Sequence, residues 1–300
     1  MTFPRLVAFL LFALALAAPA SRAADAPRHV EGHLASGATY VVDVPATWNG
    51  TLLLYSHGYA RGPDNPARNA PDTGDVNGLL EQGYALAGSS YARTGWAIEQ
   101  AVPDQLATLD AFAERFGKPR RTLAWGSSMG GLVTIALMEQ HPARFQGGLA
   151  ICASASGTLG MMNAALDGAF VFSQLAAPEL PVLMTQAGAE AGKARAAWQA
   201  AVDAAQRTPE GRARIGLAAA VAQVPLPQDN IASADTPLAD VQTALYRGLL
   251  PATLMPRDDQ TERAGGGNFS WNDGIDYAVQ LRDSGRAEWV RALYKEAGLN

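Results

Sequence analysis

The chain has little cysteine and no excess of basic residues, and each shortage excludes a class of function. Cys152 is the single cysteine among 300 residues, so no disulfide can form within the chain and no cysteine-based metal site exists. Its apolar neighbours predict that Cys152 is buried. The formal net charge is −5, which argues against nucleic acid or an anionic membrane as partner. Since 48% of the residues are hydrophobic, the chain can still bury a full core.

Long hydrophobic runs are also missing, apart from one near the first residue. Residues 6–18 carry almost no polar side chains and follow the basic Arg5, as in a secretory signal, and the run is too short to span a membrane comfortably. Small residues at Ser21 and Ala23 predict cleavage after Ala23, with a retained anchor helix as the alternative. We therefore expect residues 1–23 to be a signal peptide, the protein to be secreted or periplasmic, and no stable membrane anchor to remain after signal removal.

The most informative motif lies at residues 123–131, which read Leu-Ala-Trp-Gly-Ser-Ser-Met-Gly-Gly. An apolar run breaks into the pattern G-x-S-x-G, formed by Gly126, Ser128 and Gly130, and passes directly into a helix-like segment at residues 132–139. This order of strand, sharp turn and helix is typical of a nucleophile elbow, in which a strained turn holds the serine hydroxyl at the carboxyl edge of a sheet. Both glycines are expected because a Cβ there would collide with the neighbouring strand or helix.

The rest of the first half alternates between buried strands and helices. Each expected strand is a short apolar run bounded by turn residues, and each helix has apolar positions at helical spacing. The expected strands are residues 38–45, 51–56, 84–88, 122–125 and 147–153, and the expected helices before the elbow are residues 76–82 and 102–116. Strands that alternate with helices form right-handed βαβ units. The predicted fold class is therefore α/β, with a doubly wound, mostly parallel sheet.

Beyond Gly157 the pattern changes to helices separated by loops that contain Pro or Gly, with no clear buried strand. The expected helices are residues 163–175, 189–206, 211–224, 239–249 and 274–293. We interpret this alanine-rich region as a helical cap inserted after the sixth strand. The predicted organisation is a signal peptide at residues 1–23, the front half of an α/β core at 24–158 and a helical cap region at 159–300.

Residues 38–157 resemble the α/β-hydrolase superfamily. More narrowly, residues 89–96 (Ser-Ser-Tyr-Ala-Arg-Thr-Gly-Trp), residues 102–105 (Val-Pro-Asp-Gln), the elbow and residues 141–145 (His-Pro-Ala-Arg-Phe) are similar to secreted bacterial members of the esterase and serine-peptidase-like kind. The resemblance implies an α/β-hydrolase core. It also implies a serine hydrolase with Ser128 as nucleophile, which cleaves carboxylic esters, or amides, through an acyl-enzyme and needs no cofactor.

The resemblance also implies how the site is built around Ser128. The backbone amides of Met129 and Tyr59 would form the oxyanion hole, and a small-molecule ester or a peptide would be the substrate. We expect His57 and Gly58 to support the loop that carries Tyr59, because this histidine would lie on the oxyanion side and not opposite the hydroxyl.

The acid and the base of a catalytic triad have no evident candidates. In such hydrolases the triad follows the chain order Ser, acid, His, and only His141 among the histidines comes after Ser128. We expect His141 to cap the end of the elbow helix, and His29 and His33 to lie on solvated surface rather than to bind a metal. None of the acids after Ser128 ends an apolar strand, as a triad acid should.

We expect from this that the sequence is a shortened product, or that the missing strands and base are simply not encoded, and that the activity is impaired. The alternative is a non-catalytic pseudo-hydrolase or ligand-binding protein on the same fold. A phosphate or dinucleotide binder is disfavoured, because the segment from Gly126 to Gly131 lacks both the G-x-G-x-x-G spacing and a Walker lysine.

Overall fold

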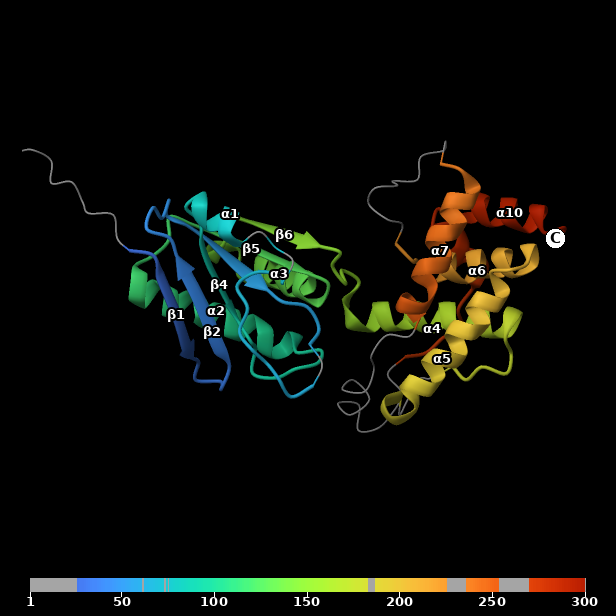
Figure 1. Cartoon of the computed structure of the whole chain (residues 1–300), viewed down its shortest axis with the longest axis horizontal. Coiled ribbons are helices and arrows are strands. Elements are labelled where there is room, and N and C mark those ends of the chain that lie inside the picture. Colours follow the sequence, from blue (N-terminus) through green and yellow to red (C-terminus); the bar gives the residue numbers. More distant parts are fainter. Residues whose placement is uncertain are drawn as a thin grey trace, which may run out of the picture.

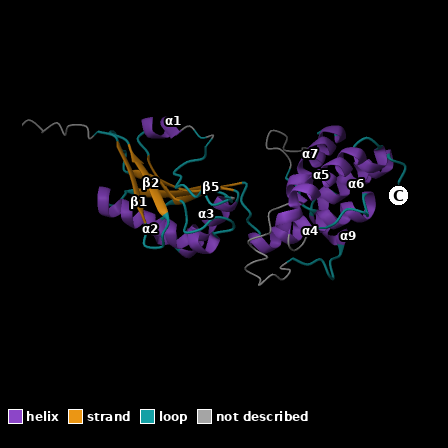
Figure 2. Cartoon of the chain, turned by 60° about the horizontal axis from the view of Figure 1, so that its bottom comes forward, coloured by secondary structure: helices purple, strands orange, loops and turns teal. Residues whose placement is uncertain are grey.

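The structure is a computed structural model that describes residues 26–60, 62–72, 74, 76–182, 187–225, 236–253 and 270–299, with only the backbone described for residues 187–193. The predicted signal peptide, residues 1–23, lies outside the described residues. In chain order all the described strands come before helix α4 (Gly157–Ala176), and the described residues after it form helices and loops (Figure 2). The chain therefore has a sheet region followed by a helical region.

The sheet region is built on one mixed sheet, visible in Figure 1. Its strands are β1 (Arg28–His33), β2 (Thr39–Val44), β3 (Thr51–Ser56), β4 (Ala85–Ser89), β5 (Arg121–Ser127) and β6 (Gly147–Ile151). The order across the sheet is β1-β2-β4-β3-β5-β6. The β1–β2 and β2–β4 pairs are antiparallel, whereas β4, β3, β5 and β6 run parallel. The mostly parallel α/β sheet expected from the sequence is confirmed.

Strand β1 was not predicted, and its composition explains why. Of its six residues only Val30 is buried, and the charged and polar side chains around it give no alternation of apolar and polar residues. The strand forms because its backbone pairs with β2 in a regular antiparallel register. His29 and His33, expected on solvated surface, are exposed on this edge strand.

The helices of the sheet region are α1 (Val76–Glu81), α2 (Ile98–Phe116), α3 (Met129–Gln140) and the short 3₁₀ helix η1 (Pro142–Arg144). Helix α2 begins a turn earlier than expected, because Pro103 lies inside the helix instead of marking its first turn. Its apolar stripe is buried against β3 and β4. Helix α3 packs on β5 and β6 and starts directly after the motif serine. The elbow is thus held between β5 and helix α3.

The region around β6 differs from the sequence expectation for Cys152. This cysteine is exposed, with a positive φ of 46°, so the prediction of a buried Cys152 was wrong. Among the strands that the structure describes, β6 pairs only with β5. Leu149 in its middle keeps 58% of its surface exposed. Apolar neighbours therefore do not imply burial here, because the edge strand itself is partly uncovered.

The helical region has its own hydrophobic core, which is centred on α6 (Pro209–Val221). Helices α4, α7 (Leu238–Thr253) and α10 (Ala287–Glu296) pack against α6, and α5 (Ala187–Ala205) contacts it as well. Small side chains make this packing close: Gly168 of α4 has no room for a Cβ beside Ala222. No helix within the described ranges is both long and apolar enough to cross a membrane.

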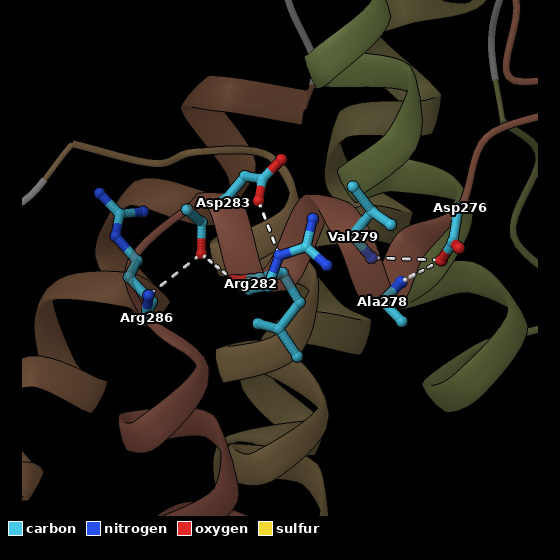
Figure 3. A network of polar contacts seen from close by, with 8 residues as sticks. Asp276, Ala278, Val279, Arg282, Asp283 and Arg286 are labelled. Carbon is cyan, nitrogen blue, oxygen red and sulfur yellow. Dashed lines mark hydrogen bonds and ion pairs between the residues drawn. The ribbon is translucent and has the colours of Figure 1, made fainter.

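The last predicted helix, residues 274–293, is two helices. Asp276 caps the N-terminus of α9 (Tyr277–Asp283), because its Oδ1 accepts hydrogen bonds from the amides of Ala278 and Val279 at 2.9 and 3.2 Å (Figure 3). The chain then turns at Gly285, with φ of 69°, before α10 begins. Glycine readily takes this left-handed conformation, which ends a helix. In the sequence the apolar spacing continues across both helices, so the break between them was not predicted.

Candidate active site

Ser128 lies at the junction between a parallel strand and a helix. Strand β5 ends at Ser127 and helix α3 begins at Met129. Between them Ser128 has φ of 58° and ψ of −122°, outside the regions that side-chain-bearing residues normally occupy. The expectation of a strained backbone at this serine is confirmed. Because the residue is exposed, its hydroxyl is accessible at the carboxyl end of a parallel strand.

The two motif glycines are required by close backbone contacts. A Cβ on Gly126 would overlap the carbonyl oxygen of Gly130, and a Cβ on Gly130 would overlap the carbonyl oxygen of Ser56 at the end of β3. Gly131 is also confined, since its Cβ would lie 2.7 Å from the Cβ of Ala153. The turn is tight because β5, α3 and the ends of β3 and β6 all converge on it.

The N-terminus of α3 presents backbone amides beside the serine. The amide of Ser128 donates to the carbonyl of Ile151 at 3.0 Å, and the Ser128 carbonyl accepts from Gly131 at 3.0 Å. Met129 is the first residue of the helix, so its N–H has no acceptor within the helix. The helix dipole adds partial positive charge at this end. The position suits an anion that forms next to the serine hydroxyl.

The loop after β3 passes directly beside the elbow. A Cβ on Gly58 would lie 3.3 Å from the carbonyl oxygen of Ser127 and 3.5 Å from the Cβ of Ser128. Tyr59 follows, and its ring packs against that of Trp96 with 5.3 Å between centroids. The structure thus places Gly58, the residue before Tyr59, against the serine. The assignment of Met129 and Tyr59 to an oxyanion hole stays a prediction that this placement fits.

His57 is buried beneath that loop, and both ring nitrogens face backbone carbonyls. Nδ1 lies 2.7 Å from the oxygen of Gly58 and Nε2 lies 3.1 Å from the oxygen of Ser90. Burial lowers the pKa of His57, although both carbonyl contacts oppose that effect. Buried between the carbonyls of Gly58 and Ser90, the imidazole is poorly placed to take a proton from a serine. This geometry fits the expected support of the oxyanion loop.

The other histidines lie elsewhere. His29 contacts the Asp43 carboxylate at 2.7 Å, and this hydrogen bond raises its pKa. His141 follows the last residue of α3, about 18 Å along the helix from its start. No hydrogen bond among the described residues joins a histidine to the Ser128 hydroxyl. The described residues also contain no group of three or more side chains that could hold a metal ion.

Sequence reasoning missed several buried polar residues behind the site. Asp104 of α2 is 3% exposed and accepts a hydrogen bond from the amide of Ala92 at 2.8 Å. Gln105 beside it is fully buried and donates to the carbonyl of Tyr55 at 2.6 Å. Tyr91 is buried with φ of 61°. For Asp104 and Gln105 the available signal was the presence of polar side chains on the apolar face of an amphipathic helix.

Comparison with known proteins identifies a matching family model and a similar amidase. A model of the prolyl oligopeptidase family matches residues 75–171, from just before α1 into α4. The o-phthalyl amidase of Xanthobacter agilis is 30% identical over 299 aligned residues, which cover 90% of this chain and 64% of that protein. The chain therefore spans less than two thirds of this relative's length.

Solved structures similar to the chain include two esterases. An esterase of Pyrococcus furiosus is 18% identical, with 50% of this chain and 56% of that chain covered and a TM-score of 0.37. A thermostable carboxyl esterase of Bacillus coagulans is 15% identical, with 55% of each chain covered and a TM-score of 0.37. The match to the prolyl oligopeptidase family and the amidase relative agree with the mixed sheet and the strained Ser128 turn: the chain is a member of the α/β-hydrolase superfamily.

Proposed function

We propose that the chain is a serine hydrolase that cleaves carboxylic esters or amides through an acyl-enzyme on Ser128. The observation that carries the proposal is the strained, exposed serine between β5 and α3, with φ of 58°. Strain of this kind persists only where the surrounding structure enforces it, and it is common at reactive residues. The 30% identical relative is named an amidase, which supports including amides beside esters.

In the proposed reaction the Ser128 oxygen attacks the substrate carbonyl and its proton goes to a general base. The carbonyl oxygen becomes negative and accepts hydrogen bonds from the amides of Met129 and Tyr59. The bond to the leaving alcohol or amine then breaks as that group takes up a proton. Water hydrolyses the resulting ester on Ser128 and releases the acid. The substrate would be a small-molecule ester or amide, or a peptide.

No described histidine is placed to act as a base for this hydroxyl. His57 is engaged by two carbonyls, and His141 lies at the far end of α3. A serine without a base attacks poorly, although an oxyanion hole and substrate binding alone leave a residual acceleration of about 10³ to 10⁴ over water. The same observation favours the second candidate function, a non-catalytic ligand-binding protein on the same fold.

Two further parts of the proposal rest on sequence patterns. The basic and apolar residues 1–23 support export through a signal peptide, and hence a secreted or periplasmic protein. The helices from α4 onward follow the sixth strand, which supports a cap role for the helical region. Neither the negative net charge nor the lack of a basic run suits nucleic acid as partner.

A fluorophosphonate probe tests the two candidate functions. We expect the probe to label the purified protein covalently at Ser128, and the Ser128→Ala variant to remain unlabelled. Ser127→Ala is the matched control, because Ser127 is an ordinary strand residue next to the elbow, and it should be labelled as the wild type is. Absence of labelling in the folded wild type would contradict the hydrolase and favour the ligand-binding protein.

A further inference from the structure

Tyr91 is an unusual residue that the proposed reaction does not use. It lies two positions after β4, is 1% exposed and has φ of 61°. A bulky residue rarely adopts this left-handed conformation, which is strained and persists only when the surroundings impose it. The strained backbone places a large buried side chain where a regular continuation of the strand would not.

The side chain of Tyr91 makes two contacts with His57. The two rings stack with 4.0 Å between centroids and an interplanar angle of 19°. The phenol oxygen donates a hydrogen bond to the His57 carbonyl at 3.0 Å. Burial raises the pKa of Tyr91, so the hydroxyl keeps its proton and remains a donor. One side chain therefore fixes both the ring and the backbone of His57.

These contacts control two successive peptide groups of the loop after β3. The His57 carbonyl belongs to the peptide before Gly58, and the phenol of Tyr91 holds it. The Gly58 carbonyl belongs to the next peptide, whose nitrogen is that of Tyr59, and it lies 2.7 Å from Nδ1 of His57. No cis peptide occurs among the described residues. In a trans peptide the C=O and N–H point in opposite directions. The His57 ring therefore sets the direction of the Tyr59 N–H.

The neutral imidazole has one N–H for two facing carbonyls. The shorter contact, 2.7 Å to Gly58 against 3.1 Å to Ser90, assigns that proton to Nδ1. The Nε2 contact then does little to hold the ring, and the stacked face of Tyr91 becomes its main restraint.

Tyr91 is itself anchored to other parts of the sheet region. Asn65 of the loop before α1 donates to the Tyr91 carbonyl at 3.0 Å. The amide of Ala92 donates to the buried carboxylate of Asp104 in α2 at 2.8 Å. The hydroxyl of Ser90 also donates to the Tyr91 carbonyl at 2.9 Å. The left-handed turn is thus held by both α2 and the loop after β3.

We propose that Tyr91 is a positioning residue of the active site: by stacking on His57 and bonding its carbonyl, it orients the Gly58–Tyr59 peptide so that the Tyr59 N–H faces the serine. The inference rests on the proposed function, in which that N–H binds the oxyanion. Tyr91 does not touch the substrate in this account. It acts through His57 and the loop, and its effect should be larger in the transition state than in substrate binding.

The Tyr91→Phe variant removes the hydrogen bond and retains the stacked ring. We expect kcat for a nitrophenyl ester to fall about tenfold with KM changed less than twofold, because one oxyanion donor is worth about 10² to 10³ and a misdirected donor retains part of that. Tyr91→Leu removes the ring as well and should lower kcat further. Tyr246→Phe is the matched control: it loses a phenol hydrogen bond of 2.7 Å to Asp203 in the helical region and should leave kcat unchanged.

A second readout does not require turnover. Crystal structures of Tyr91→Phe and Tyr91→Leu should show the Gly58–Tyr59 peptide rotated from its wild-type orientation. An unchanged peptide in both variants would overturn the inference, whatever the activity. Unchanged kcat in both variants, while Ser128→Ala abolishes turnover, would overturn it and leave the hydrolase intact. If Ser128→Ala retained full turnover, the proposed function itself would fail.

Discussion

At the scale of single residues, Ser128 is exposed and has a backbone conformation that is unfavourable for any residue with a Cβ. Replacing it by glycine removes the Cβ that makes φ of 58° unfavourable. We expect Ser128→Gly to raise the free energy of unfolding by about 1 kcal/mol or more, since strain of this kind costs 1 to 3 kcal/mol. Urea denaturation measures the difference.

The neighbouring serine provides the control for this prediction. Ser127 lies in the regular part of β5, where it pairs with Ile151. Ser127→Gly should lower stability by roughly 0.5 to 1 kcal/mol, as glycine does in strand interiors. Equal losses for the two variants would show that the turn at Ser128 is not strained in solution.

Asp167 allows a second prediction at this scale. This buried carboxylate of α4 accepts hydrogen bonds from Tyr277 at 3.1 Å and from Gln280 at 2.7 Å, both in α9. Burial raises its pKa above the ordinary 3.8, against the effect of both hydrogen bonds. The folded protein therefore binds this proton more tightly than the unfolded chain. Its stabilising contribution is complete below about pH 3.8 and is lost as the pH rises through the folded pKa.

The Asp167→Asn variant cannot ionise at this position. The amide of Gln280 can turn its otherwise unpartnered Oε1 toward the new side-chain nitrogen. We expect the variant to gain stability over the wild type as the pH rises above the ordinary pKa of 3.8. Thermal unfolding from pH 3 to pH 7 measures this trend. A stability difference that stays constant over that range would argue against a buried titrating carboxylate.

At the scale of elements, β6 is an edge strand that contains no buried residue. It pairs only with β5 among the described strands, and Leu149 is 58% exposed beside an apolar groove of about 340 Å³ lined by Leu53, Leu79, Leu123 and Trp125. Uncovered edges with apolar side chains promote association between chains. We expect Leu149→Lys to raise the soluble fraction on concentration, measured by light scattering.

A control separates the strand edge from surface hydrophobicity in general. Leu175 is 40% exposed in α4, away from the sheet. Leu175→Lys should improve solubility less than Leu149→Lys does. The same improvement from both changes would mean that the edge strand has no special part in association.

Some of these elements could be predicted from the sequence, and others could not. Strand Thr51–Ser56 could be predicted because burial on both faces gives a continuous apolar run. The G-x-S-x-G turn could be predicted because its tight backbone contacts require glycine. Strand β1 could not be predicted from the sequence, because its residues are mostly polar and it forms a strand by pairing with β2. The conformation of Tyr91 could not be predicted from the sequence either. Its positive φ depends on contacts with His57, Asn65 and Asp104 that only the fold creates.

At the scale of the whole molecule, the described residues assemble an elbow and a candidate oxyanion loop without a histidine bonded to the serine. Losing a triad member that acts with the others costs on the order of 10⁶ in turnover. We therefore expect the 300-residue protein to hydrolyse short nitrophenyl esters very slowly, as measured by nitrophenolate release. Fast turnover that Ser128→Ala abolishes would reveal a base that the described histidines do not supply.

The central claim is that Ser128 forms a covalent acyl-enzyme, and mass spectrometry of the acylated protein tests it most directly. Without a base, hydrolysis of the intermediate should also be slow, so the adduct should accumulate with 4-nitrophenyl acetate. The account predicts one acetyl group on the peptide that contains Ser128, present in Ser127→Ala and absent in Ser128→Ala. No acetyl group on that peptide in the folded wild type, or an equal amount in Ser128→Ala, would contradict it.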